Sequence, residues 1–331
     1  MRRLARSGVR GKQGKRKQRN RLADLITAIK KVLEHTDLVL GWTTATSTGV
    51  AAPARFYTAD EAEAAVFDST CVHNLAVHLP RLKDKDVGIV AKPCDAQSVV
   101  ELVVEREVAR GKVKVIAAPC RAMLDVKLIW RRFGYGARIE DEGGRLQVNG
   151  REVPREDFIL RKCLSCESTD PVIVDEQVEG DGHTGGPPDV GGRTDDLKER
   201  FAAMSVDERR AFWAEQFSRC IRCYACRDVC PMCFCRDVCL MQTRVPHWTG
   251  GSVESRDSEM AQMIRVSHLA GRCTGCGECE RACPVGIPLL LLMNEQYRLI
   301  EEMFDYRPGS DIEARPPMQT FSIETDLWEG G

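Results

Sequence analysis

Near the start of the chain, apolar residues recur every three or four positions. They lie at Leu22, Leu25, Ile26, Ile29, Val32 and Leu33. This spacing places them on one face, so it predicts a helix from residue 21 onward. The apolar run 37–41 predicts a buried strand that ends at a glycine. Thr58 and Glu61 have the spacing of a capping box, which predicts the start of the next helix.

Two short apolar runs further on flank a segment with helical periodicity. The runs cover residues 87–91 and 113–118, and the helical pattern covers residues 96–110, so together they predict a strand–helix–strand unit. Each run is followed by a Pro-Cys pair, which brings Cys94 and Cys120 to the carboxyl ends of the strands. Ligands gather at such ends, so both thiols are candidates to lie near a cofactor. An equally open alternative is that both are buried and pack as small apolar side chains.

Turn residues divide the remainder of the first half. Turn signals on both sides of residues 145–148 predict a β-hairpin over residues 137–153. Residues 180–193 hold six glycines and two prolines, a composition that forms no core. We therefore predict an α/β domain with a partly parallel sheet over residues 21–178, and a linker or loop over residues 179–194.

The second half has helical patterns. Ser205 and Glu208 form a second capping-box spacing, and an apolar pattern over residues 289–303 predicts another helix. We predict a helical domain over residues 195–305. Residues 306–331 contain prolines and little periodicity, so we expect a C-terminal arm that lies over another subunit.

Two cysteine runs in this helical domain share one spacing. Three cysteines separated by two residues are followed, after three further residues, by a fourth cysteine and a proline. Bacterial ferredoxins with two clusters use this spacing, and the fourth cysteine of each run binds the other cluster. The sequence thus predicts a bacterial-ferredoxin-like domain with two 4Fe–4S clusters. Cluster one would be held by Cys220, Cys223, Cys226 and Cys283, and cluster two by Cys273, Cys276, Cys279 and Cys230.

Zinc and disulfides are the alternatives for these cysteines. Zinc needs four thiolates in two pairs and does not explain two full runs with matching prolines at Pro231 and Pro284. Disulfide frameworks are typical of short secreted chains, whereas this chain has 331 residues and no secretory signal. Iron–sulfur chemistry is therefore the favoured interpretation.

Eight cysteines lie outside the two runs: Cys71, Cys94, Cys120, Cys163, Cys166, Cys233, Cys235 and Cys239. We predict a third centre, a 4Fe–4S cluster, held by Cys163 and Cys166 together with two of Cys233, Cys235 and Cys239. A zinc site with the same ligands, or unliganded buried cysteines, are the alternatives.

Charge is unevenly distributed. The net charge is −1, but residues 1–21 hold ten Lys or Arg and no acid, which leaves −11 for the remainder. We expect the basic arm, residues 1–20, to dock on an acidic partner or to be solvated. We do not expect nucleic acid as a partner, because no recognised nucleic-acid fold follows and the arm lacks aromatics for stacking. No apolar run reaches membrane length, and 16 cysteines without a secretory signal indicate a cytoplasmic protein.

Two known families resemble parts of this sequence. Residues 88–95, Ala118 to Cys120 and Lys162 to Cys166 resemble the β-subunit family of deazaflavin-coenzyme-reducing hydrogenases and formate dehydrogenases, over about residues 37–175. Residues 220–284 resemble ferredoxin-like subunits found beside heterodisulfide-reductase-type complexes. The first resemblance implies an α/β domain that can hold FAD and pass electrons from a deazaflavin to clusters. Here the ferredoxin module is C-terminal, and no G-x-G-x-x-G fingerprint follows a predicted strand.

These observations predict an electron-transfer subunit of a multisubunit, anaerobic oxidoreductase. Its partners would be heterodisulfide-reductase-like, hydrogenase-like, formate-dehydrogenase-like or flavoprotein subunits. No catalytic residue is predicted, because no acid/base pair or activated nucleophile is evident and the six histidines are scattered. The alternative is a flavin-containing subunit that oxidises or reduces a deazaflavin or nicotinamide coenzyme and passes electrons to its own clusters.

Overall fold

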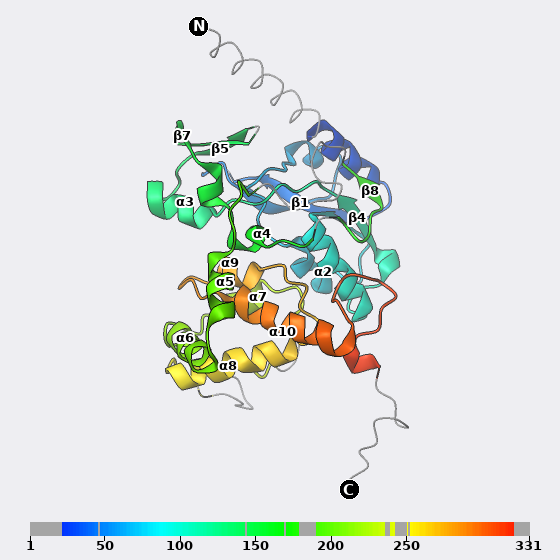
Figure 1. Cartoon of the computed structure of the whole chain (residues 1–331). Coiled ribbons are helices and arrows are strands. Elements are labelled where there is room, and N and C mark those ends of the chain that lie inside the picture. Colours follow the sequence, from blue (N-terminus) through cyan, green and yellow to red (C-terminus); the bar gives the residue numbers. More distant parts are fainter. Residues whose placement is uncertain are drawn as a thin grey trace. The chain divides into compact units, whose positions relative to one another are not determined.

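The computed structural model describes residues 22–45, 47–142, 144–168, 170–178, 190–235, 239–241, 250 and 252–320 (Figure 1). The described residues up to Ala96 and from Ala109 to Asp195 form one compact unit, here called the α/β unit. Gln97–Val108 and the described residues from Asp196 onward form a second, the helical unit. The predicted basic arm, most of the predicted linker and the end of the predicted C-terminal arm lie outside the described residues.

A five-stranded mixed sheet forms the centre of the α/β unit. Its spatial order is β2-β1-β3-β4-β8. The strands are β1 Leu38–Thr44, β2 Ala51–Phe56, β3 Val87–Ala91, β4 Val113–Ala117 and β8 Glu176–Gln177. β1, β3, β4 and β8 run parallel, whereas β2 pairs antiparallel with β1. The predicted α/β class with a partly parallel sheet is confirmed, and β2 is a strand that the apolar pattern did not predict.

A helix over residues 22–33 packs closely on this sheet. Its Val32 side chain comes so near β3 that a Cβ atom on Gly88 would lie 2.6 Å from a Val32 methyl and 2.6 Å from a Val39 methyl. Only glycine leaves room for this approach. Leu25 and Ile29 on the same helix are buried, as the apolar spacing predicts.

The helix after β3 begins earlier than predicted. α2 covers Pro93–Val104, whereas the pattern predicted residues 96–110. Proline is favoured at the first position of a helix because its missing N–H would have no partner there. As a result, Cys94 lies in the first turn of α2. The Thr58–Glu61 capping box forms its hydrogen bonds, but only a 3-10 turn, η1 Glu61–Ala64, follows it instead of the predicted helix.

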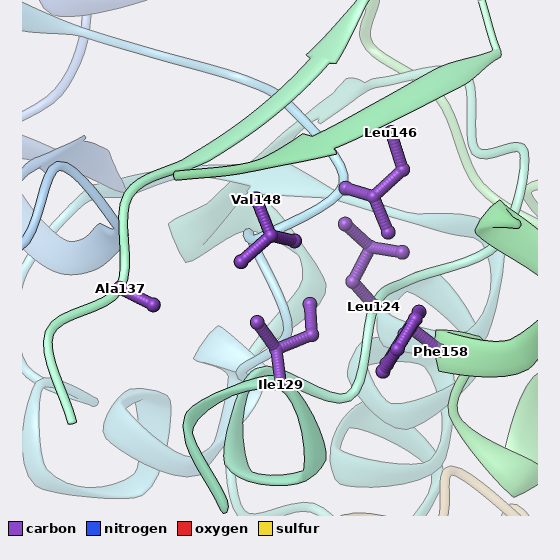
Figure 2. Packing of buried hydrophobic residues seen from close by; sticks show 6 residues of the cluster. All are labelled: Leu124, Ile129, Ala137, Leu146, Val148 and Phe158. Atoms are coloured by element: carbon purple, nitrogen blue, oxygen red, sulfur yellow. The ribbon is translucent and has the colours of Figure 1, made fainter. Parts of the chain in front are cut away.

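A second, smaller sheet occupies the place of the predicted hairpin. Its strands are β5 Ile139–Glu142, β6 Arg145–Val148 and β7 Arg151–Val153, in antiparallel order. Asn149 and Gly150 both have positive φ angles, of 51° and 76°, which suits the tight turn between β6 and β7. Helix α3, Val126–Phe133, packs on this sheet through a cluster shown in Figure 2. The cluster comprises Leu124, Ile129, Ala137, Leu146, Val148 and Phe158.

Short helical turns complete the α/β unit. They are η2 Leu75–Arg81, η3 Arg110–Lys112, η4 Arg155–Phe158 and α4 Arg161–Leu164. Arg110 binds both carboxylate oxygens of Asp175 at 3.0 Å, which ties the segment before β4 to the segment before β8. The parallel edge of the sheet is therefore closed by an ion pair as well as by backbone hydrogen bonds.

Besides most of α2, the described residues from Asp196 onward give the helical unit six further α-helices. They are α5 Asp196–Ala203, α6 Val206–Ser218, α7 Ala225–Asp228, α8 Ser255–His268, α9 Glu278–Ala282 and α10 Leu289–Phe304. α6 packs on α8, α7 packs on α9, and α10 contacts both α8 and α9. The predicted Ser205–Glu208 capping box is present in full. Among the described residues, no helix is long and apolar enough to cross a bilayer.

Three sets of polar contacts join residues 97–108 to the rest of the helical unit. Ser98 bonds Thr274 at 3.0 Å, and Arg272 binds Glu105 at 3.0 Å. Glu101 accepts hydrogen bonds from the Tyr306 hydroxyl and, at 2.7 Å, from the Gly309 N–H. The described part of the predicted C-terminal arm, which includes η5 Pro317–Gln319, is thus held to its own chain at Glu101.

Candidate metal centres

The first cysteine run forms a tight loop after α6. Cys220 follows that helix, and Cys226 lies on the short helix α7. Between them, Arg222 and Tyr224 adopt left-handed backbone conformations, with φ angles of 50° and 61°. These two positions turn the chain between Cys220 and Cys226, and the thiols of these two cysteines interact electrostatically.

The second run repeats this backbone with different residues. Gly275 and Gly277 have φ angles of 67° and 68°, at the same offsets from Cys273 as Arg222 and Tyr224 have from Cys220. α9 then carries Cys279, as α7 carries Cys226. The two runs are therefore an internal structural repeat, as their shared spacing suggests.

The fourth cysteines lie beside the opposite runs. Burial raises the pKa of the Cys226 thiol, and the thiols of Cys220 and Cys283 are close enough to raise it further. Burial raises the pKa of Cys273 to about 12, and Cys230 and Cys276 again contribute. Thus Cys283, from the second run, interacts with Cys226 of the first, and Cys230, from the first run, interacts with Cys273 of the second, as the predicted exchange requires.

The Cys279 thiol completes the second set. Burial raises its pKa, and the thiols of Cys273, Cys230 and Cys276 raise it further. Cys223, the remaining member of the first set, is exposed at the surface of the unit. The ligand assignment made from spacing stays a prediction, and this arrangement supports it.

The donors of both sets are thiols, which are the ligands that a 4Fe–4S cluster takes. Among the residues that the structure describes, no three His, Cys, Asp or Glu side chains form a group that could hold a metal ion. Cys220, Cys226, Cys279 and Cys283 are buried, whereas Cys230, Cys273 and Cys276 are partly buried.

The α/β unit brings together four further cysteines. Cys94 lies at the start of α2 after β3, Cys120 follows β4, and α4 carries Cys163, with Cys166 just beyond it. Burial raises the pKa of Cys120 to about 11, and the Cys163 thiol contributes. Burial also raises the pKa of Cys94, and the Cys166 thiol raises it further. The pKa of Cys166 is in turn raised by burial and by the Cys120 thiol. The Pro-Cys pairs therefore lie near the C-x-x-C pair, a relation that sequence spacing did not reveal.

Two lysines supply positive charge around these four thiols. Lys92 is fully buried, donates to Asp95 at 2.6 Å and to the His73 carbonyl at 2.8 Å, and lies over the Trp42 ring. Burial lowers the pKa of Lys92, but the nearby Asp95 carboxylate outweighs it, so the net shift is upward. Lys162 lowers the pKa of both Cys94 and Cys163. The lysines oppose the effect of burial but do not outweigh it, because the pKa of all four thiols is raised.

The predicted third centre draws on both units. Cys163 and Cys166 lie in the α/β unit, whereas Cys233, Cys235 and Cys239 lie in the helical unit. A hydrogen bond with the Cys230 thiol lowers the pKa of Cys233. Cys235 is exposed. That combination of ligands stays a prediction. Cys71 is buried, and its thiol contacts the Val66 carbonyl at 3.8 Å, which is typical of a structural cysteine.

Several polar residues around these sets were not predicted from the sequence. Lys92 and Asp95 are among them, and so are Gln262 and Arg265 on α8, both buried among the thiols of the helical unit. For Gln262 and Arg265 the sequence held no signal, because no helix was predicted over residues 255–268 and the burial of a helix face depends on what packs against it.

Comparison with known proteins identifies the helical unit. Residues 216–287 match the family described as a 4Fe-4S dicluster domain. The prediction that this region holds two 4Fe–4S clusters is confirmed by that match. The match covers both cysteine runs and the helix α8 between them.

Longer similarities extend into the α/β unit. The F420-dependent formate dehydrogenase subunit beta of Methanocaldococcus jannaschii is 26% identical over 302 residues, which covers 73% of this chain and 78% of that protein. The F420-dependent formate dehydrogenase 1 subunit beta of Methanococcus maripaludis is 35% identical over 106 residues, or 32% of this chain and 26% of that protein.

A solved structure was also compared. A chain of the F420-reducing NiFe hydrogenase complex from Methanosarcina barkeri aligns with a TM-score of 0.33 and 15% identity, over 45% of this chain and 59% of that chain. The resemblance inferred from the Pro-Cys and C-x-x-C motifs is confirmed by the curated relatives. The chain is thus similar, over most of its length, to β subunits of F420-dependent formate dehydrogenases, and it carries a 4Fe–4S dicluster domain.

Proposed function

We propose that this protein is an iron–sulfur electron-transfer subunit of a multisubunit oxidoreductase and relays single electrons between redox centres of its partners. The observation that carries the proposal is the match of residues 216–287 to a 4Fe-4S dicluster domain. The electrostatic interaction of Cys283 with Cys226, and of Cys230 with Cys279, supports the predicted exchange of fourth cysteines. When bound, each 4Fe–4S cluster accepts and releases one electron. The role of the chain is to bury the thiolates, to hold their spacing and to exclude water.

The partners follow from the relatives. Both curated relatives are named as β subunits of formate dehydrogenases, so the proposed partners are the other subunits of a formate-dehydrogenase-like, hydrogenase-like or heterodisulfide-reductase-like complex. We also propose a cytoplasmic location, which is supported by 16 cysteines that all remain outside disulfides.

The test is anaerobic purification of the full chain with its native partners, followed by analysis of iron, sulfide and electron paramagnetic resonance. Two cubane signals after reduction, and a partner that re-oxidises them, are expected. Zinc in place of iron, or reduced protein without a paramagnetic signal, would contradict the proposal. A matched variant, Cys71→Ser, alters a buried cysteine outside the proposed ligands and should leave both signals present.

A third iron–sulfur centre in the α/β unit is also proposed, with Cys94, Cys120, Cys163 and Cys166 as ligands. Their mutual proximity and the cationic Lys92 and Lys162 support it. Wild-type protein should then hold about twelve iron atoms per chain, and Cys120→Ser about eight. Cys235→Ser should leave the content unchanged. Loss of iron from Cys235→Ser instead would support the set that combines Cys163 and Cys166 with the cysteines of the helical unit.

A second candidate function is that of a flavin-containing subunit that exchanges electrons with a deazaflavin or nicotinamide coenzyme. The similarity to the Methanocaldococcus relative favours it, because that protein is named as F420-dependent and the alignment covers 73% of this chain. Flavin absorbance in protein released by denaturation, together with coenzyme-dependent reduction of the clusters, would support this function. Full iron content without flavin would contradict this second function and leave electron relay as the only proposed function.

A further inference from the structure

Helix α8 presents a buried polar face to the thiols of both ferredoxin runs. Ser258, Gln262 and Arg265 are four and three residues apart, so they lie on one face of the helix. Their exposed fractions are 0%, 2% and 3%. The helix lies in the segment between the two runs, which is longer than two clusters alone require. A fully buried polar face in that position needs an explanation.

The Gln262 amide contacts one thiol set only. Its Nε2 lies 3.9 Å from the Sγ of Cys220 and 3.9 Å from the Sγ of Cys226. Ser258 supports the same region by donating its hydroxyl to the Cys220 carbonyl at 3.3 Å. Hydrogen bonds to cluster sulfurs are one of the protein's means of setting a cluster's reduction potential.

Arg265 interacts electrostatically with thiols of both sets. It lies one helical turn from Gln262 on the buried face of α8, and the thiols of Cys279, Cys230, Cys226 and Cys233 raise the pKa of its guanidinium against the lowering effect of burial. Cys279 and Cys230 belong to the second set, whereas Cys226 belongs to the first. The guanidinium also approaches the Met293 sulfur at 4.0 Å, while its Nε atom is buried with no hydrogen-bond partner.

This arginine is not paired with an acid. Within the described part of the chain, no carboxylate lies at ion-pair distance from its guanidinium. A buried, unpaired positive charge is costly to fold, and arginine does not lose its proton to escape that cost. The charge is compensated if negative clusters occupy the spaces that the thiols surround, because thiolates and added electrons are anionic.

We propose that Arg265 is a positioning residue shared by the two clusters, whose fixed charge raises the reduction potential of both, while Gln262 acts on cluster one alone. Each reduction adds one electron, and therefore one negative charge, to a cluster. A nearby cation in a site of low dielectric stabilises that reduced form and is little screened by salt. This inference rests on the proposed ligand sets. It names the residues that set the difference in reduction potential between the two clusters.

The experiment is an anaerobic redox titration of the full chain, followed by electron paramagnetic resonance, with each cluster measured alone. Cys276→Ser leaves cluster one, and Cys223→Ser leaves cluster two. Arg265→Met placed in each background should move the remaining potential to more negative values, and Arg265→Lys should restore part of that shift. Gln262→Leu should shift cluster one only. Arg256→Met removes the same charge from an exposed position on α8 and should shift neither potential.

The outcomes separate this inference from the function on which it rests. Absence of two cubane signals in the wild type would overturn the proposed function itself. If both signals are present and Arg265→Met leaves both potentials unchanged, the inference about Arg265 fails. If Gln262→Leu moves both clusters equally, the selective role of Gln262 fails. Should Arg265→Met lose iron, the Arg265→Lys and Gln262→Leu variants decide the question, because they keep the charge or leave it untouched.

Discussion

The two cysteine runs reach one backbone geometry by different means. In the second run, glycines occupy the left-handed positions 275 and 277, where a missing Cβ atom removes the steric cost. In the first run, Arg222 and Tyr224 adopt the same conformation, at a cost of about 1–2 kcal/mol each. The first run therefore depends on its surroundings to hold a shape that the second run adopts freely.

Arg222 shows how the surroundings achieve this. Its guanidinium is buried and donates to the carbonyls of Gly250, Ser252 and Met241, all in the segment between the runs. The second run is secured differently, since Thr274 and Arg272 bind Ser98 and Glu105 of the 97–108 segment. The comparison teaches that the repeat is shared in backbone but not in its supports, so the two clusters should respond differently to the same kind of change.

Substitution of the fourth cysteine of either run should have the largest effect, a loss of iron. Cys230→Ser should deplete the cluster of the second run, and Cys283→Ser that of the first, because each fourth thiol lies beside the opposite set. Each variant should lose about four of eight iron atoms in the dicluster domain. Iron analysis and paramagnetic resonance provide the measurement. If Cys230→Ser removed the same signal as Cys223→Ser, the runs would each hold their own cluster and the exchange would be disproved.

Removal of the Arg222 side chain should be the next largest effect. Arg222→Ala removes hydrogen bonds to three backbone carbonyls and should lower the free energy of unfolding of the helical unit by about 1–3 kcal/mol. Anaerobic denaturant unfolding of the full chain measures it. Arg256→Ala, on the exposed side of α8, is the control with little expected change. An equal loss in both variants would show that the carbonyl contacts do not support the first run.

Substitution of the glycine at the equivalent position should have a smaller effect. No atom lies within 4 Å of a Cβ built on Gly275, so Gly275→Ala tests the backbone conformation alone. We expect a loss of about 1 kcal/mol in the free energy of unfolding. Tyr224→Gly, at a left-handed position of the first run, relieves backbone strain, and this gain in stability should offset part of the stability lost with the tyrosine side chain. If Gly275→Ala were neutral, backbone strain would not distinguish the two runs.

A pH dependence tests the support of the second run. Burial raises the pKa of Glu101 from its ordinary value near 4.5 to about 8, although hydrogen bonds from Gly309 and Tyr306 oppose the shift. The folded state then holds a proton that the unfolded state releases, so stability should fall as pH rises from about 4.5 to about 8 and level off above. Glu105 and Arg272 also face this carboxyl. Glu101→Gln should flatten the slope in unfolding measured across this range, and an unchanged slope would assign it to another group.

Much of the candidate site follows from local sequence. Cysteine spacing indicates two cubanes because each run must wrap three thiols around one cluster and then cross to the other. The Ser205–Glu208 capping box and the buried runs at β3 and β4 form as predicted, since caps and apolar strands depend on neighbours in the chain. The strand β2 was missed because its alternate residues are exposed and it contains a proline.

Only the tertiary structure decided which distant groups meet. The strand pattern predicted Cys94 and Cys120 at the carboxyl ends of the strands, but nothing in the spacing placed Cys163 and Cys166 near them. Likewise, no helix was predicted over residues 255–268, and the burial of Gln262 and Arg265 near the thiols depends on what packs against that face of α8. The sequence by itself determined the chemistry of the ligands, whereas long-range packing determined the charges and hydrogen bonds around them.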